Sequence, residues 1–567
     1  VPLAGYPPPL LRRPLQRGPS HRPAPPPDAC PLPKTGARSP LSAPSRFKHP
    51  GCAPPLRTHR QLPRQLEELF RSRHLLALLV ALLALLTPTQ AVDRPNIILL
   101  MGDDHGWEET GYNGHPYLHT PILDTMAGAG LRFDRFYAAH PSCSPTRGSV
   151  LTGRHPNRYG TFAPNWSMRP EEITIAHLLR AAGYTTGHFG KWHVGPVKAA
   201  SPTNPGAMGF DEWLSHDNFF ELNPVLSRDG GPPDRFEGES SEVLIAETIR
   251  FISRAKESGT PFLAVVWFGS PHEPYSGLAK DLALYDNLPG RYARKDVSLT
   301  SNETGVAVRR PLRDVLRERY AEITAMDRAI GTLRDYLALQ DLRENTLIWY
   351  NGDNGTPPSG LADTPLRGLK GTMYEGGIRV PGIIEWPERI PTPRVSKIPA
   401  VTSDILPTIA ALAGQVVPER PLDGINLESL IDGTMTSRPE PIFFWSFNVD
   451  NLSAQQREPY IAPTLQEGTT PLVKLMNGIQ TRNFQNFRYT ATAVHDFDGP
   501  RVVLDNNYKL VVGGSDGSGT ELFDVTNDLA EKNNLARGEP AVIERMEKQL
   551  QQWQQSTLSS LTGADYR

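Results

Sequence analysis

The chain has 567 residues, of which 38% are hydrophobic and 21% are charged, and its mean hydropathy is −0.39. These values are typical of a soluble globular protein and are not those of a membrane protein. The formal net charge of −2 hides an asymmetry, because residues 92–567 hold 46 Lys and Arg against 58 Asp and Glu. That acidic balance argues against a surface that binds nucleic acid or another polyanion, so a local cluster of cations must attract any anionic substrate.

The first 91 residues are not typical of a folded domain. Residues 1–74 carry 18 of the 56 prolines, and their 13 Lys and Arg face three acids, so we expect a disordered basic tail or a start codon assigned too far upstream. Residues 75–86 are an unbroken Leu, Ala and Val run between a basic flank and the small residue Ala91. This layout predicts a signal peptide over 75–91 and export of a mature chain from about Val92, without a stable membrane anchor, because the run is too short to span a bilayer.

The next 340 or so residues alternate between two hydrophobic patterns. Apolar runs at 97–101, 262–268 and 346–350 predict buried strands, and periodic segments at 173–182, 242–258 and 315–339 predict helices. This order predicts an α/β domain over 92–437, a mostly parallel sheet flanked by helices. Ligands of such sheets bind beyond the carboxyl ends of the strands, so we expect the polar residues that follow the three strands to converge: Asp103, Asp104, His272, Asp353 and Asn354.

The pattern changes after about residue 438. Short runs at 442–447, 502–504 and 508–512 predict antiparallel strands, the last two joined at Asp505-Asn506-Asn507. A helix is predicted at 542–556, with Leu550 and Trp553 on its buried face. We therefore expect a smaller α+β subdomain over 438–567, an antiparallel sheet plus a helix.

Cys143 is the single cysteine of the predicted mature chain, since Cys30 and Cys52 precede it. An exported protein with one cysteine has no internal disulfide framework, so we expect this thiol to be reactive or modified. It lies just before a helical segment led by Pro145, and a helix N-terminus favours anions. Taken alone, Cys143 is also explained as part of a Pro-punctuated turn.

Three carboxylates and one amide follow the first and third predicted strands. Asp103, Asp104, Asp353 and Asn354 form an all-oxygen set that suits Ca²⁺ or Mg²⁺. Each pair, seen alone, is explained equally well by a helix cap or a turn.

The segment Cys143-Ser144-Pro145-Thr146-Arg147 fits the pattern Cys-x-Pro-x-Arg and resembles the signature of type I sulfatases. In that family a formylglycine-generating enzyme oxidises the cysteine to formylglycine. The likeness covers residues from about 94 to 556 and is greatest to the arylsulfatase A and N-acetylgalactosamine-6-sulfatase branch. It implies an alkaline-phosphatase-like fold and one Ca²⁺ held by five residues: Asp103, Asp104, Cys143 as formylglycine, Asp353 and Asn354.

The resemblance also implies roles for five other residues. Arg147 would hold the formylglycine hydroxyl, Lys191 would bridge formylglycine and sulfate, and His193 would deprotonate the hydroxyl during sulfate release. His272 and Lys370 would contact the sulfate and the leaving oxygen, with His272 as general acid. The segment Glu375-Gly376-Gly377-Ile378-Arg379 resembles a family segment to which we assign a structural role.

The resemblance implies a sulfuric ester hydrolase that acts on sulfated carbohydrate, with aryl sulfates as artificial substrates. One alternative is a phosphodiesterase or phosphonate monoester hydrolase of the same superfamily, and another is a secreted glycan-binding protein without catalysis. Four residues near the catalytic segments could contact a sugar, although ordinary packing explains each of them better: His105, Trp107, Asn165 and Trp166.

Overall fold

A computed structural model describes residues 94–300, 306–360, 363–448, 458–476, 479–492, 497–513 and 519–566. These ranges all belong to one compact unit, Thr89–Arg567. The predicted basic tail and signal peptide lie outside the described residues. In the part of the chain that is described, no helix is both long enough and apolar enough to cross a membrane.

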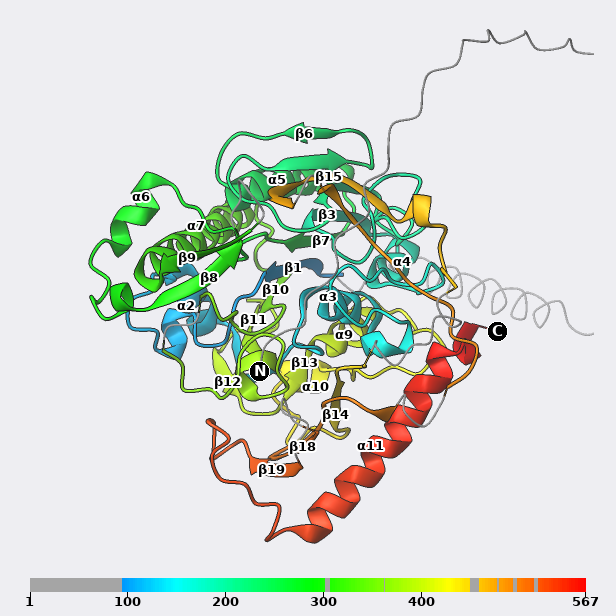
Figure 1. Ribbon diagram of the computed structural model, residues 1–567. Helices are drawn as coiled ribbons and strands as arrows, with labels where there is room; N and C mark the ends of the chain where they lie inside the picture. Colours follow the sequence, from blue (N-terminus) through cyan, green and yellow to red (C-terminus); the bar gives the residue numbers. More distant parts are fainter. Residues whose placement is uncertain are drawn as a thin grey trace, which may run out of the picture. The chain divides into compact units, whose positions relative to one another are not determined.

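A large mixed sheet forms the centre of this unit (Figure 1). Its middle strands β10, β1, β7, β3 and β4 run parallel to one another, whereas β11 is antiparallel to both β10 and β2, and β5 is antiparallel to β4. The predicted mostly parallel sheet is therefore confirmed. The strands, in spatial order, are β12 (Arg394–Ser396), β2 (Leu131–Tyr137), β11 (Arg379–Glu385), β10 (Thr346–Gly352), β1 (Asn96–Gly102), β7 (Phe262–Trp267), β3 (Thr185–Lys191), β4 (Glu212–His216), β5 (Val225–Arg228) and β6 (Pro233–Arg235), with β13 (Ala400–Val401) beside β2.

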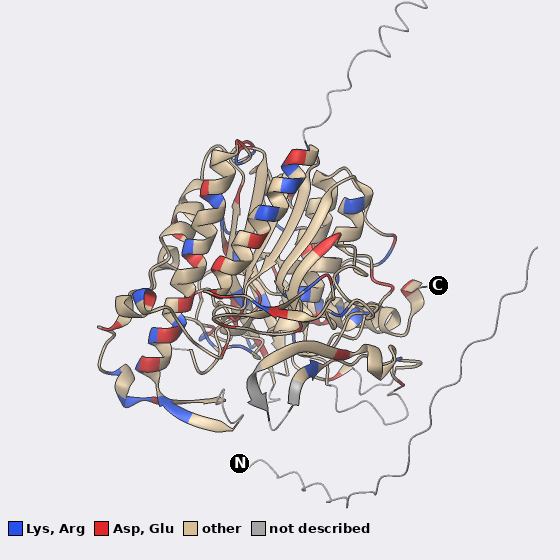
Figure 2. Ribbon diagram, turned by 90° about the horizontal axis from the view of Figure 1, so that it is seen from above, with Lys and Arg blue, Asp and Glu red and all other residues tan. Residues whose placement is uncertain are grey.

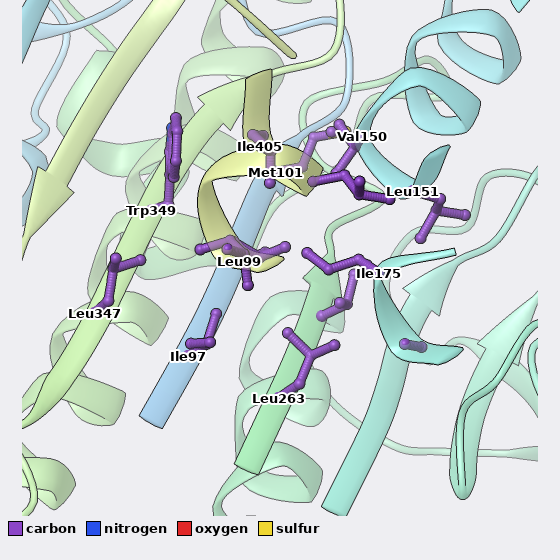
Figure 3. Close-up of a cluster of buried hydrophobic side chains, with 14 of the residues drawn as sticks. Ile97, Leu99, Met101, Val150, Leu151, Ile175, Leu263, Leu347, Trp349 and Ile405 are labelled. Atoms are coloured by element: carbon purple, nitrogen blue, oxygen red, sulfur yellow. The ribbon is translucent and has the colours of Figure 1, made fainter. Parts of the chain in front are cut away.

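The two faces of the sheet are covered by different helices. Because strand side chains alternate, Ile97, Leu99 and Met101 of β1 join one core, while Ile98 and Leu100 join the other. Figure 3 shows the first core, where Val150, Leu151, Ile175 and Ile405 approach the side chains of β1, β7 and β10. The first face is covered by α3 (Cys143–Thr152), α4 (Ile175–Ala181) and α9 (Ile405–Leu412), and the second by α2 (Pro121–Ala129), α5 (Ser240–Ser258) and α7 (Leu312–Leu339).

The predicted helices at 173–182, 242–258 and 315–339 correspond to α4, α5 and α7, with ends that differ by at most three residues. Thr174 ends the chain's extended stretch before α4, because its hydroxyl accepts the amide N–H of His177 at 3.3 Å as an N-cap. Figure 2 shows that the sheet strands carry few charges and that Lys, Arg, Asp and Glu lie mostly on helices and loops. The short helices are α6 (Ala279–Leu282), α8 (Glu375–Ile378) and α10 (Glu428–Ile431).

A second, antiparallel sheet follows near the C-terminus. It contains β14 (Ile442–Trp445), β17 (Arg501–Asp505), β18 (Tyr508–Val512) and β19 (Thr520–Asp524). One face of this sheet packs on α11 (Pro540–Leu561) through Leu550 and Trp553, as predicted. The other face packs on buried residues of the large sheet and of the loops beside it. The predicted antiparallel sheet plus helix is present, and the division of the chain near residue 438 stays a prediction.

Two hairpins complete the described structure. One joins β8 (Asp296–Thr300) to β9 (Ala307–Pro311). The other joins β15 (Glu467–Met476) to β16 (Ile479–Asn483), and its β15 strand contacts β5 of the large sheet. Asp217, which directly follows β4, holds the second hairpin: its Oδ2 accepts the amide N–H groups of Thr469 at 2.7 Å and Thr470 at 2.8 Å.

Candidate active site

The polar residues predicted to converge do so at the carboxyl ends of the parallel strands. Asp103 and Asp104 directly follow β1, Lys191 is the last residue of β3, and Asp353 directly follows β10. The amide N–H of Asp353 donates to the carbonyl of Gly102 at 3.1 Å, which ties the two strand ends together. Parallel neighbours in the order β10-β1-β7-β3 therefore bring residues from four distant segments to one place.

Cys143 is the first residue of α3 rather than a residue ahead of the helix, which corrects the predicted position slightly. Its side chain is 1% exposed. Burial raises the pKa of the Cys143 thiol to about 12, and the opposing effects of Lys191 and Lys370 are smaller. A thiol in this environment stays protonated at neutral pH, so it is a poor nucleophile as it stands.

A cluster of ligand atoms surrounds Cys143. Asp103, Asp104, Cys143 and His272 each offer one atom, and these atoms all lie within 4.8 Å of one another. Among the described residues, Asp103 Oδ1 and Asn354 Oδ1 are buried oxygens without a hydrogen-bond partner. Orphaned oxygens beside carboxylates fit a hard cation that takes oxygen ligands, so the residues present suit the expected metal.

Asp353 and Asn354 contact the same cluster from β10. Asp353 Oδ1 accepts the amide N–H of Asp104 at 2.8 Å, and Asp353 Oδ2 accepts Arg147 Nη2 at 2.7 Å. Asn354 Nδ2 donates to Asp104 Oδ1 at 2.8 Å. All five residues predicted as metal ligands thus lie together, and His272, which the family resemblance places at the sulfate and the leaving oxygen, joins them.

Each carboxylate of the cluster faces a buried or partly buried cation. Arg147 Nη2 lies 2.7 Å from Asp353, Lys191 Nζ lies 2.6 Å from Asp103, and Lys370 Nζ lies 2.5 Å from Asp104. Burial alone raises the pKa of Asp104, but Lys370, His272 and Lys191 together lower it well below its usual range. The three carboxylates and three cations balance in charge.

The two histidines differ in which nitrogen is engaged. His193 Nε2 meets Asn165 Oδ1 at 3.0 Å and so donates to it, while Nδ1 is buried without a partner in the described chain. His272 Nδ1 meets the carbonyl of Glu273 at 2.5 Å, and its Nε2 lies 3.7 Å from Asp104 Oδ2. Burial lowers the pKa of both imidazoles, and nearby Lys191 lowers the pKa of His193 further.

The four candidate sugar contacts have different outcomes. His105 contacts Tyr350 and the carbonyl of Glu109, Trp107 lies under the guanidinium of Arg379 at 4.9 Å, and Trp166 belongs to the C-terminal core. Asn165 lies in the site, where it orients His193. Packing thus accounts for three of the four.

Arg319 is a residue of the site that sequence reasoning missed. Its Nη2 donates to the carbonyl of Asp104 at 2.6 Å, and its Nε donates to Glu109 Oε1 at 2.7 Å. Asp104 has a left-handed φ of 63°, and its carbonyl is held by Arg319, whose guanidinium is in turn fixed by the buried ion pair with Glu109. Arg319 lies inside the long amphipathic helix α7, where an arginine gives no sequence signal of such a contact.

Comparisons with known proteins identify the family of the chain. The Sulfatase family model matches residues 95–415. Canine N-acetylgalactosamine-6-sulfatase is 32% identical over 410 residues, which cover 65% of this chain and 72% of that protein. Human arylsulfatase A is 33% identical over 398 residues, which cover 66% and 73%. The ulvan-active sulfatase of Formosa agariphila is 30% identical over 352 residues, which cover 61% and 66%.

Solved structures share the fold at lower identity. Ps i-CgsB in complex with k-i-k-neocarrahexaose has a TM-score of 0.65 and 24% identity, covering 82% of this chain and 93% of that one. The phosphonate monoester hydrolase of Agrobacterium radiobacter has a TM-score of 0.54 and 20% identity, covering 82% and 96%. These likenesses confirm the predicted fold class. The chain belongs to the sulfatase family and is a sulfuric ester hydrolase.

Proposed function

We propose that this protein hydrolyses sulfate esters of carbohydrates with a formylglycine formed from Cys143 and one bound Ca²⁺. The observation that carries the proposal is the position of Cys143: it is buried at the N-terminus of α3, with Asp103, Asp104 and His272 within ligand distance. An inert, buried thiol among carboxylates and lysines is a poor catalyst, whereas a formylglycine there would have every partner that sulfate transfer needs.

Two groups, the formylglycine and Ca²⁺, would supply the chemistry of the reaction. As a hydrate, the formylglycine has two hydroxyls: one attacks sulfur as the alcohol leaves, and the other loses its proton so that sulfate departs and the aldehyde re-forms. Ca²⁺ on Asp103, Asp104, Asp353 and Asn354 would supply positive charge beside the sulfuryl oxygens.

The chain's own residues would handle the protons and the anion. Asn165 fixes a proton on His193 Nε2, so the buried, unpaired Nδ1 is the atom that accepts the hydroxyl proton. Glu273 fixes a proton on His272 Nδ1, so Nε2 can donate to the leaving oxygen only from the charged imidazole, which an adjacent sulfate stabilises. Lys191 and Lys370 would bind the sulfate, and Arg147 would orient the nucleophile.

The proposed substrate class comes from relatives. N-acetylgalactosamine-6-sulfatases and an ulvan-active sulfatase are among the similar proteins, and one solved relative is bound to D-glucosamine-2-N,6-O-disulfate. Export through residues 75–91 and a catalytic domain that ends near residue 437 belong to the same proposal.

The test measures free sulfate released from sulfated glycans and an aryl sulfate after expression with a formylglycine-generating enzyme. Mass spectrometry of the peptide around Cys143 checks its conversion, and Cys143→Ala is the baseline. Release above this baseline is expected. If converted protein cleaves a phosphonate monoester and no sulfate ester, the phosphonate hydrolase alternative replaces the proposal, and if it binds glycans without cleaving either, the glycan-binding alternative does.

A further inference from the structure

Arg482 lies beside the site, and no described residue pairs with its charge. It belongs to β16, is half-buried, and its Nε is buried without a hydrogen-bond partner in the described chain. Burial lowers the pKa of its guanidinium, and no described acid opposes that effect. The other described cations of the site, Arg147, Lys191, Lys370 and Arg319, each face a carboxylate, so Arg482 is a surplus positive charge among them.

The segment around Arg482 is next to His193. The ring of Phe484 lies 6.3 Å from the ring of His193, and the amide N–H of Gln485 donates to the carbonyl of Asn165 at 3.1 Å. After burial, Lys191 and Arg147, the charge of Arg482 is a further cause that lowers the pKa of His193. The segment that carries Arg482 thus packs against His193 and Asn165, and the charge of its guanidinium acts on His193.

The hairpin that carries Arg482 is held in place. Asp217 Oδ2 accepts the hydroxyl of Thr470 at 2.7 Å in addition to the two backbone amides of the hairpin. Asp217 follows β4, whose last residue His216 pairs with Lys191 at the end of β3. The same sheet edge thus positions Lys191 and the hairpin, so Arg482 has a defined place relative to the proposed sulfate site.

A half-buried guanidinium without a counter-charge gains most from a ligand that supplies one. Carboxylates and sulfates accept two parallel N–H bonds from arginine, and such charge-assisted bonds are about twice as strong as neutral ones. Under the proposed function, Lys191 and Lys370 would already bind the sulfate that is cleaved. We propose that Arg482 binds a second anionic group, a carboxylate or another sulfate, on the carbohydrate whose sulfate ester is cleaved. This inference rests on the proposed function and narrows its substrate class to carbohydrates with at least two anionic groups.

The test is a binding measurement on Cys143→Ala protein with Ca²⁺, because this variant needs no maturation and cannot turn over. The probes are singly sulfated N-acetylgalactosamine, the same sugar with two sulfates, and the singly sulfated sugar linked to a uronic acid, together with the matching glucosamine series. We expect the doubly charged probes of one series to bind about tenfold or more tightly than the singly charged one. Adding Arg482→Gln should remove that preference, and Arg482→Lys should retain part of it. The two doubly charged probes distinguish a second sulfate from a carboxylate.

The matched control is Arg488→Gln. Arg488 follows in the same segment, is exposed, and stacks over the ring of Tyr460 at 4.5 Å, so its loss should change neither affinity nor preference. Equal weakening of all probes by Arg482→Gln would overturn the inference, because it would mean contact with the shared sulfate or a structural role; so would an unchanged preference. Circular dichroism and thermal unfolding identify a variant that fails to fold. If Arg482→Gln does not fold, the preference of Arg482→Lys for the doubly charged probes tests the inference instead. Since binding is read without hydrolysis, an inactive unmutated enzyme would refute the proposed function separately.

Discussion

Replacing Lys509 by Met should destabilise the contact between the C-terminal sheet and the catalytic core. Lys509 is fully buried in β18, with its Nζ 2.9 Å from Glu375 Oε1 and 2.8 Å from Glu531 Oε1. In the variant, Glu375 keeps Arg379 at 3.2 Å, whereas Glu531 keeps the amide N–H of Glu375 at 2.7 Å but has no other ion pair within the described residues. Breaking a buried ion pair costs about 3–5 kcal/mol, and we expect the lower end because Glu531 can take up a proton.

The loss of stability caused by Lys509→Met should depend on pH, and the environment of Glu531 determines in which direction. Burial raises the pKa of Glu531 to about 7, although Lys509 opposes this. The folded pKa exceeds the unfolded one, so the native state binds the extra proton below pH 7, and the stability that this proton provides is lost as pH rises toward 7. The ionised Glu531 that needs Lys509 therefore exists mainly above pH 7. We expect a loss of about 3 kcal/mol at pH 8 and at least 1 kcal/mol less at pH 6.

Thermal unfolding at the two pH values measures this difference. For a folded unit of about 470 residues, 3 kcal/mol corresponds to a midpoint shift of about 3 °C. Lys532→Met is the matched control, because Lys532 is exposed and lies next to Glu531 in the chain. A Lys509→Met midpoint equal to that of the control, or an equal loss at both pH values, would refute the reasoning.

Two further substitutions test the site's backbone and its base. Gly355→Ala should abolish soluble expression or activity, because the added Cβ would lie 1.8 Å from the carbonyl oxygen of Gly376, whereas Gly128→Ala in α2 meets nothing within 4 Å and should leave melting temperature and activity within error or slightly higher. Asn165→Ala should lower kcat about tenfold or more with little change in KM, because His193 loses the hydrogen bond that fixes its tautomer; a change confined to KM would mean that Asn165 contacts substrate instead.

The sequence predicted the parts of the fold that depend on local pattern. The buried strands β1, β7 and β10 are unbroken apolar runs, and the helices α5 and α7 are amphipathic, so each could be found without its neighbours. Strand β11 was not predicted, because Pro381 and Gly382 interrupt its apolar residues, and the structure has a register shift at that point. Its antiparallel direction depends on pairing with β10 and β2, which no local pattern encodes.

The candidate site likewise has a part that the sequence predicted and a part that it did not. Residues at strand ends could be brought together by topology alone, and the structure places them within contact distance. Their partners could not be predicted, because each contact joins segments far apart in the chain. Arg319 reaches Asp104 across 215 positions, and Lys509 reaches Glu375 across 134. A polar residue inside a helix or strand is usually explained by exposure to solvent. Only the packed structure shows that these residues are buried.

The pairing of lysines with carboxylates leads to a last prediction, that cation and sulfate bind cooperatively. Lys191 contacts Asp103 Oδ2, and Lys370 contacts Asp104 Oδ1, so these ammonium groups use oxygens that the proposed Ca²⁺ ligation needs. A cation on those oxygens would release both ammoniums for an anion, whereas without it they remain neutralised. Inorganic sulfate should therefore bind Cys143→Ala protein at least tenfold more weakly after removal of divalent cations with a chelator, and added Ca²⁺ should restore the affinity.

Calorimetry with sulfate in both metal states measures this coupling without turnover, and titration of Ca²⁺ with and without sulfate must give the same factor, because the linkage is reciprocal. Lys370→Met separates the two causes. If released lysines produce the coupling, this variant shows a smaller factor than the unmutated site, because one of the two ammoniums is missing. If Ca²⁺ attracts sulfate by its own charge alone, the factor is unchanged and the reasoning from the ion pairs fails.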